Sequence, residues 1–321
     1  YLSEAGKVAN GATEFQTFQT TLEQQHKISC YNTVDQVPSV TGENTKRLGI
    51  ISARTADNPM LLKDCIGAGC HSVYLEKPGA PSVGELEEMR DQAKKAGVTV
   101  LMGFNKNVAK YATETMKAAA AHPGSIVTFV HNNNYSKDDL GECFERNSEG
   151  MLKNMAIHEL ALLVTFYGVS TETIASVEAD KEYSSCQTIK GPFSGNDFTD
   201  FDKLKFTVTT KDGAKVSVAA DRCGGDDSVG IVETSGGNEI ARFSMPDEKH
   251  LAKIPELEKQ QPGAAPYFYV QDPDYLTLKQ RIAKNCVDGT PAEGVASIEV
   301  AVEALKVAEY LTPILQEQLL S

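Results

Sequence analysis

A lysine that follows shortly after an apolar run is the first candidate for a chemical role in this chain. The run Val73-Tyr74-Leu75 is typical of a buried strand, and Glu76-Lys77-Pro78 follows and ends it. In open α/β sheets, ligands bind at the carboxyl ends of the strands, so a lysine placed there could meet a ligand. Pro78 fixes the path by which the chain leaves the strand. The alternative is an exposed Glu-Lys pair before a turn, which is common and contributes little to stability. This stretch alone favours the surface pair.

A histidine and an asparagine in an apolar segment are the second candidate. In residues 153–159 (KNMAIHE), Asn154 and His158 are four residues apart and would share one face of a helix. An imidazole beside a carboxamide in a cleft could give or take a proton near neutral pH. The alternative is a histidine whose hydrogen bonds are satisfied in the core. The zinc-protease pattern H-E-x-x-H is excluded because position 162 is leucine, and the six histidines show no metal-ligand spacing. We therefore predict no metal site.

The third candidate is Gly103-Phe104-Asn105-Lys106-Asn107, which follows another strand-like run. Asparagine and lysine side chains at a strand end could donate hydrogen bonds to the oxygens of a ligand. The alternative is a simple junction between a strand and a helix, in which the asparagine is an N-cap. Locally the two interpretations are equally good.

Strands position the first and third candidates, because each follows the end of an apolar run. Residues 48–53, 73–75 and 98–104 are apolar runs of the kind found in buried parallel strands. Residues 60–69 and 82–96 lie between them and read as helices. Strands that alternate with helices predict a doubly wound, Rossmann-type parallel sheet.

Local signals mark the starts and ends of these helices. Asn58 with Pro59 resembles an N-cap with proline at the first helical position. Ser82 and Glu85 have the spacing of a capping box, and Gly97 is placed to end the second helix in a left-handed conformation. Before the first strand, residues 21–26 could form a short helix and 28–31 a short strand, with a helix-like turn from Thr33.

The pattern changes after residue 122. Period-2 alternation predicts a mainly antiparallel sheet from the segments 125–131, 173–179, 204–210, 214–220, 228–233 and 239–243. Lys211-Asp212-Gly213 is a hairpin turn between two of them. We therefore predict a doubly wound α/β domain at residues 1–122, followed by an α+β domain at residues 123–321.

The remaining segments of the second half read as helices and connections. Residues 151–167 are apolar enough to form one buried helix, and 132–150 read as a long polar loop from which Tyr135 and Lys137 could reach a cleft. Residues 246–274 read as a proline-rich, charged connection. Two helices are predicted after it, at 275–287 and 293–319.

Composition excludes several classes of protein. The net charge of −13 argues against a nucleic-acid surface, because phosphates are neutralised by clustered lysine and arginine. No apolar run approaches the 18 or more residues of a membrane span. The seven cysteines contain no C-x-x-C pair, so neither a zinc site nor a disulfide framework is indicated. The cytoplasm or another reducing compartment is the expected location.

The order and spacing of the three candidates resemble the glucose–fructose oxidoreductase / inositol dehydrogenase (Gfo/Idh/MocA) family, from about Leu48 to the C-terminus. Glu76-Lys77-Pro78 resembles the family's E-K-P signature, and Gly103-Phe104-Asn105 its G-F-N strand end. Residues 154–158 resemble the D-x-x-x-H helix of its second domain. Residues 204–220 resemble the antiparallel sheet that often covers the substrate and pairs subunits.

The resemblance implies an oxidoreductase that uses NAD or NADP and acts on a sugar, a polyol or a related hydroxyl compound. It implies that residues 1–122 are the dinucleotide-binding domain and that residues 123–321 are the substrate and oligomerisation domain. Lys77 would touch the nicotinamide ribose and the reacting hydroxyl, and His158 would be the general acid/base, positioned by Asn154. The nicotinamide would carry the hydride. The implied cofactor-binding residues are Ser52, Arg54, Thr55, Glu76, Lys77 and Asn105. The implied partners are a carbohydrate-like substrate and further copies of the chain, paired through the antiparallel sheet.

Two departures from the family pattern keep a second hypothesis open. The family's aspartate is Asn154 here, and a carboxamide can hydrogen-bond but cannot relay a proton. The Gly-rich G-x-G-x-x-G turn is absent from these 321 residues, and we expect it to lie upstream of Tyr1. The competing hypothesis is a catalytically silent relative that serves as a binding or structural subunit. A third hypothesis keeps the cofactor but performs redox-neutral chemistry with transient oxidation.

Overall fold

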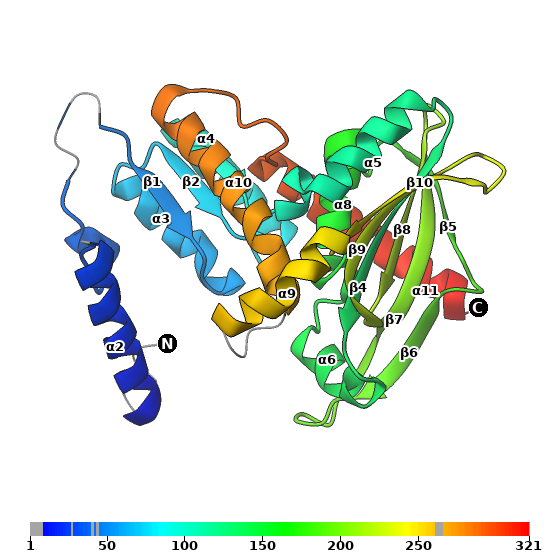
Figure 1. Cartoon of the computed structure of the whole chain (residues 1–321), viewed down its shortest axis with the longest axis horizontal. Helices are drawn as coiled ribbons and strands as arrows, with labels where there is room; N and C mark the ends of the chain where they lie inside the picture. Colours follow the sequence, from blue (N-terminus) through cyan, green and yellow to red (C-terminus); the bar gives the residue numbers. More distant parts are fainter. Residues whose placement is uncertain (1–8, 27, 40–41, 43–44, 261–265, 321) are drawn as a thin grey trace.

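Two β-sheets lie side by side in the computed structural model of the chain, with long C-terminal helices between and across them (Figure 1). The structure describes residues 9–26, 28–39, 42, 45–260 and 266–320. Within these ranges, no helix is long and apolar enough to span a membrane.

The first sheet is parallel and contains β1 (Leu48–Ile51), β2 (Ser72–Leu75) and β3 (Thr99–Met102) in that order. Helices α3 (Asn58–Gly67) and α4 (Val83–Ala96) connect the strands. Helix α10 (Pro266–Asp288) contacts β2, and its Leu278 and Ile282 join a second apolar cluster with Tyr74 and Leu101. This arrangement confirms the predicted Rossmann-type sheet.

Exposure differs between the strands of this sheet. All four residues of β2 are buried, as expected for a central strand. In β1, however, Ile50 is 59% exposed, although the apolar run predicted a buried strand. The reason is that β1 pairs only with β2 in the described part of the chain, so it is an edge strand.

The predicted N-cap of α4 at Ser82 is confirmed, although the Glu85 carboxylate accepts from the Ser82 hydroxyl rather than from the backbone N–H that a capping box uses. The Ser82 hydroxyl oxygen accepts from the backbone N–H of Glu85 at 3.3 Å and donates to the Glu85 carboxylate at 2.7 Å. The helix ends at Gly97, whose φ of 68° is the left-handed conformation that glycine adopts without strain. Sequence signals of this kind succeed because they act within one turn of helix.

The predicted N-cap role of Asn58 is wrong. The N-cap residue of α3 is Asp57, and no side chain caps this helix end. Asn58 is buried, and its amide donates to the backbone carbonyl of Gly79 at 2.9 Å. The tertiary bond to the segment after Lys77-Pro78 takes the place of a local cap.

The second sheet has seven strands in the described part of the chain. They are β4 (Ile126–Asn134), β5 (Ile174–Ala179), β6 (Ser185–Lys190), β7 (Asp197–Thr210), β8 (Lys215–Asp221), β9 (Cys223–Glu233) and β10 (Glu239–Met245). The order is β10-β9-β4-β8-β7-β5, with β6 also paired to β7. Among the described pairs, β4 with β8 is parallel and the others are antiparallel, which confirms the predicted α+β half.

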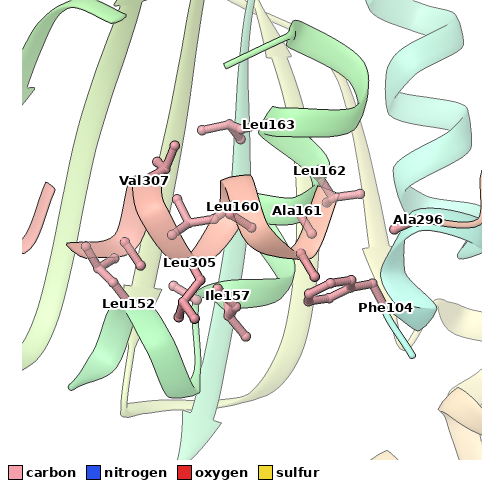
Figure 2. Packing of buried hydrophobic residues seen from close by; sticks show 14 of the residues in the cluster. Phe104, Leu152, Ile157, Leu160, Ala161, Leu162, Leu163, Ala296, Leu305 and Val307 are labelled. Carbon is pink, nitrogen blue, oxygen red and sulfur yellow. The ribbon is translucent and has the colours of Figure 1, made fainter. Parts of the chain in front are cut away.

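Helices α8 (Ile157–Tyr167) and α11 (Ile298–Leu320) build the core beside this sheet. Figure 2 shows α11 crossing α8, with Leu305 and Val307 near Ile157 and Leu160. Residues 157–163 are all buried, because α8 lies between α11 and strands β4 and β8. Such full burial explains why the sequence of α8 is apolar almost all round.

The C-terminal segment contacts both sheets. Ser297 forms an isolated antiparallel bridge with Leu101 in β3, and the Met102 N–H donates to the Ala296 carbonyl at 2.8 Å. Helix α11 then contacts α4 as well as α8 and β5. The division into residues 1–122 and 123–321 stays a prediction, and this returning segment is one of the places where the two halves of the chain are in contact.

Several predicted connections are wrong. Residues 132–150 are not a loop, because β4 continues to Asn134 and α6 (Leu140–Arg146) buries Leu140, Cys143 and Phe144. Residues 246–274 contain α9 (Glu248–Gln260) and the first part of α10. Strand β6 was not predicted, and residues 28–31 form no strand. Tertiary packing overrides the polar composition of these segments.

Near the N-terminus, the helix-like turn after Thr33 is present as η1 (Val34–Gln36). The helix predicted at 21–26 is the end of the longer α2 (Ala9–His26).

Candidate active site

Lys77 lies at the carboxyl end of β2 and reaches across to the second half of the chain. Its Nζ donates a hydrogen bond to the backbone carbonyl of Asn154 at 3.2 Å. The Lys77–Pro78 peptide is cis. Burial lowers the pKa of Lys77, and the nearby charge of Lys106 acts in the same direction, while Glu76 opposes them. The structure thus places Lys77 beside Asn154, the polar residue named in the second candidate, rather than leaving it as a surface ion pair.

The predicted continuous helix over 151–167 is wrong. Helix α7 (Met151–Asn154) ends before α8 begins at Ile157. At the break, the Ala156 N–H donates to the Met151 carbonyl at 2.9 Å, a wider turn than that of an α-helix. The Asn154 amide donates to the Glu149 carboxylate at 2.8 Å. The observed partner of the Asn154 side chain is therefore Glu149, and what Asn154 presents to Lys77 is its main-chain carbonyl.

His158 is held near the start of α8, only 7% exposed. The ring of Phe104 meets it edge to face at a centroid distance of 5.8 Å, and the ring of His131 lies 6.3 Å away. Its Nδ1 is a buried atom without a hydrogen-bond partner in the described structure. Burial holds the pKa of His158 well below its usual range, and the positive charges of Lys77 and Lys106 lower it further. A neutral imidazole at this place can accept a proton.

A buried charge cluster lies directly behind His158. Lys106, in the short helix η3 (Asn105–Val108), donates to Glu159 at 2.7 Å. His131 Nδ1 lies 3.0 Å from the other carboxylate oxygen of Glu159. Burial alone would raise the pKa of Glu159, but Lys106 and His131 outweigh it and hold that pKa well below its usual range. The pKa of His131 is lowered, chiefly by burial.

The sequence did not predict this charge cluster. The predictions made Lys106 a possible ligand contact, and they named Glu159 only in excluding the zinc-protease pattern H-E-x-x-H. The available signal was a carboxylate inside an apolar helix, because a fully buried charge needs a charged or hydrogen-bonding partner. The sequence could not say which lysine pairs with it across 53 positions.

The predicted cofactor-binding residues lie at the ends of β1, β2 and β3. Ser52 and Arg54 are exposed, and Arg54 forms an ion pair with Asp57 at 3.0 Å. Thr55 begins a short 3-10 helix, and Glu76 accepts a hydrogen bond from the Tyr74 hydroxyl at 2.6 Å. These residues follow two neighbouring parallel strands, so they share one edge of the sheet.

Asn105 is the buried member of this group. Its amide nitrogen donates to Gln271 of α10 at 3.1 Å, whereas its Oδ1 is buried without a partner in the described structure. The adjacent Gly103 has no room for a side chain, because a Cβ there would lie 2.8 Å from a carboxylate oxygen of Glu76. The orphaned acceptor of Asn105 fits the nicotinamide ribose end of a dinucleotide, whose hydroxyls can donate hydrogen bonds, whereas the space at Gly103 is taken by the Tyr74 hydroxyl and the Glu76 carboxylate. Among the described residues, no group of three or more His, Cys, Asp or Glu side chains could hold a metal ion.

The comparisons with known proteins give a fold. No family model matches the chain, and no curated protein matches it. Solved structures do match. Myo-inositol 2-dehydrogenase from Lactobacillus plantarum is 16% identical with a TM-score of 0.64, over 93% of this chain and 85% of that one.

Two further solved structures agree with it. UDP-N-acetylglucosamine 3-dehydrogenase from Acidithiobacillus ferrooxidans is 12% identical with a TM-score of 0.62, over 94% of this chain and 87% of that one. GenD2 from gentamicin A biosynthesis, solved in complex with NAD, is 16% identical with a TM-score of 0.62, over 94% of this chain and 83% of that one. The chain has the fold of the Gfo/Idh/MocA dehydrogenases.

Proposed function

We propose that this protein is an oxidoreductase that transfers hydride between NAD or NADP and a sugar, a polyol or a related hydroxyl compound. The observation that carries the proposal is the position of Lys77 at a strand end, where it donates to the Asn154 carbonyl. Its charge helps to lower the pKa of the buried His158, which is neutral. Two of the three solved structures named above are dehydrogenases, and the third, GenD2, was solved in complex with NAD.

The two side chains have complementary roles in this proposal. Oxidation of an alcohol releases a hydride and a proton. His158 accepts the proton from the hydroxyl, since its lowered pKa keeps it unprotonated at neutral pH. Lys77 donates a hydrogen bond to the same oxygen and stabilises the negative charge that develops there. The nicotinamide, when bound, accepts or supplies the hydride.

Asn154 positions Lys77 through its main chain. The hydrogen bond between them uses the Asn154 carbonyl, and the carboxamide is engaged by Glu149. The side chain at 154 is therefore assigned a supporting role at the break between α7 and α8. Asn105 and Glu76 would hold the nicotinamide ribose, and Ser52, Arg54 and Thr55 would line the cofactor's path along the end of β1.

The alternative function is a catalytically silent binding or structural subunit. The specific observation in its favour is the carboxamide of Asn154, which cannot relay a proton and is bound to Glu149. In either case we propose that copies of the chain pair through the second sheet and that the protein works in the cytoplasm or another reducing compartment.

The test uses protein expressed from its complete reading frame. Calorimetry measures the binding of NADH and NADPH, and a panel of sugars and polyols is screened for reduction of the nicotinamide. Lys77→Met should lower kcat/KM by about 10²–10⁴-fold, because it removes a charge-stabilising donor. Asn154→Ala keeps the main-chain carbonyl and loses only a supporting side-chain hydrogen bond. Its kcat/KM should therefore fall by less than about tenfold.

The matched control is Lys117→Met, which removes an exposed lysine of α5 (Lys110–Ala121). It should leave kcat/KM unchanged. A wild-type protein that binds neither dinucleotide would overturn the proposal in favour of the binding subunit. Equal turnover by the Lys77→Met variant and the wild type would remove Lys77 from the mechanism.

A further inference from the structure

Two cysteines face each other where α3 ends, at the opposite edge of the first sheet from Lys77. The N–H of Cys70 donates to the carbonyl of Cys65 at 3.0 Å, and the N–H of Gly69 donates to the carbonyl of Ile66 at 3.0 Å. Gly69 has a φ of 76°. These two bonds with a left-handed residue form a Schellman motif, which brings the side chain two residues beyond the cap against the third-last residue of the helix. Here those two side chains are Cys65 and Cys70.

The two sulfur atoms occupy the same small space above β1. A Cβ placed on Gly49 would lie 3.0 Å from the Cys65 sulfur and 3.3 Å from the Cys70 sulfur. The missing side chain of Gly49 therefore makes room for both thiols. Cys70 is buried and Cys65 is half-buried, so small oxidants can reach the pair through Cys65.

The electrostatics of the pair favour a thiolate on Cys70. The hydrogen bond from Cys65 is the largest cause and, with the charge of Arg47, lowers the pKa of Cys70 to about 7 against the opposing effect of burial. The same hydrogen bond, together with burial, raises the pKa of Cys65. One thiol is thereby activated as a nucleophile and the other keeps its proton for the second step.

We propose that Cys65 and Cys70 form a site of reversible oxidation, in which a peroxide converts the dithiol to an intramolecular disulfide. The Cys70 thiolate attacks one peroxide oxygen, the O–O bond breaks, and Cys70 becomes a sulfenic acid while hydroxide leaves. The Cys65 sulfur then attacks the Cys70 sulfur, the S–S bond forms, and the thiol proton leaves with the sulfenic oxygen as water. The two sulfurs together lose two electrons and the peroxide gains them. Two molecules of a monothiol such as reduced glutathione reverse the change by exchange: the first forms a mixed disulfide, and the second frees the protein thiol and leaves as glutathione disulfide.

The alternative is that the two thiols only fill the space over Gly49 as small apolar side chains. The two interpretations differ in reactivity. Cys186 is the internal reference, because it is also half-buried, yet burial with Asp200 and Asp202 raises its pKa to about 11. At neutral pH, alkylation of Cys70 should be at least about tenfold faster than that of Cys186, since the thiolate is the nucleophile.

The experiment treats the native full chain with hydrogen peroxide, blocks the remaining thiols and maps the peptides by mass spectrometry. The expected product joins Cys65 to Cys70 with the loss of two hydrogen atoms, disappears on reduction with dithiothreitol, and forms at a rate that rises through about pH 7. Cys186→Ser should form it at the wild-type rate. In Cys65→Ser, the sulfenic acid on Cys70 has no partner, so it should be trapped by dimedone.

Two results would overturn the proposal. One is a peptide map of oxidised wild-type protein in which Cys65 and Cys70 stay reduced while other cysteines react. The other is cross-linking of Cys65 or Cys70 to other cysteines at the same rate as to each other, which would indicate unfolding before oxidation. Both are read on the wild-type protein, so a variant that fails to fold does not affect them.

Discussion

Removing the buried carboxylate behind His158 should destabilise the protein more than almost any other single change of charge. The Glu159 side chain is fully buried and receives Lys106 at 2.7 Å and His131 at 3.0 Å. In Glu159→Gln, the amide oxygen can keep one of these bonds, but Lys106 loses its only ion-pair partner among the described residues. Breaking a buried pair in this way costs about 3–5 kcal/mol, because the remaining charge is left without compensation. A loss of about 3–5 kcal/mol is a large share of the roughly 5–15 kcal/mol by which domains are typically stable.

The loss should depend on pH in a defined way. The pKa of Glu159 is lowered on folding, so its contribution is present above the unfolded glutamate pKa and is lost as pH falls through the folded value. Glu159→Gln lacks this titrating carboxylate. The difference in stability between the wild type and the variant should therefore be full above about pH 5 and shrink as the pH falls toward 3.

Far-ultraviolet circular dichroism during urea unfolding is the suitable assay, since the chain contains no tryptophan. Scanning calorimetry checks that one transition is being compared. The matched control is Glu114→Gln, which breaks an exposed pair with Lys117 in α5 and should cost at most about 0.5 kcal/mol. The double variant Lys106→Met/Glu159→Leu should be more stable than either single change, because no charge is left buried. A loss below about 1 kcal/mol for Glu159→Gln would refute the buried ion pair.

Two other substitutions test the packing around the site. Gly103→Ala places a Cβ 2.7 Å from the Tyr74 hydroxyl and should cost about 1–3 kcal/mol in urea unfolding and weaken NADH binding in calorimetry. Gly84→Ala, in α4 with no atom within 4 Å, is its control and should stabilise the protein by about 0.5–1 kcal/mol. Arg222→Met leaves the buried Asp200 without its 2.6 Å partner and should cost about 3–5 kcal/mol, whereas a loss below 1 kcal/mol would contradict that burial.

The sequence predicted local structure best where a single helical turn or a single strand determines it. The N-cap at Ser82, the left-handed Gly97 and the apolar strand before Lys77 are determined by residues within a few positions of one another. The prediction of a loop at residues 132–150 was wrong because the burial of this segment depends on tertiary packing. Phe144 and Cys143 are buried against other elements, with α6 contacting β6 and β7, which no local pattern reveals.

The candidate site was predictable by residue type and only partly by contact. Lys77, Asn105 and His158 could be named because motif and strand ends mark them. The bond that places Lys77, however, ends on a main-chain carbonyl, and any residue at 154 supplies a carbonyl. The side chain at position 154 therefore could not predict this hydrogen bond. The Asn154 carbonyl is exposed to Lys77 at the break between α7 and α8, where the backbone makes the wider turn at Ala156.

The charge balance around His158 links stability to the proposed chemistry. Two lysines lie near its ring, and one carboxylate opposes them, so the cations and burial together keep the imidazole neutral. Glu159 cannot itself take the proton from a substrate, because both of its oxygens are engaged and its own pKa is lowered. It instead pairs with Lys106 inside the core, and the positive charge of Lys106 in turn disfavours protonation of His158. For stability alone, apolar residues could replace the buried Lys106–Glu159 pair. In the proposed mechanism the pair has a second role, because the positive charge of Lys106 helps to keep His158 neutral and able to accept a proton.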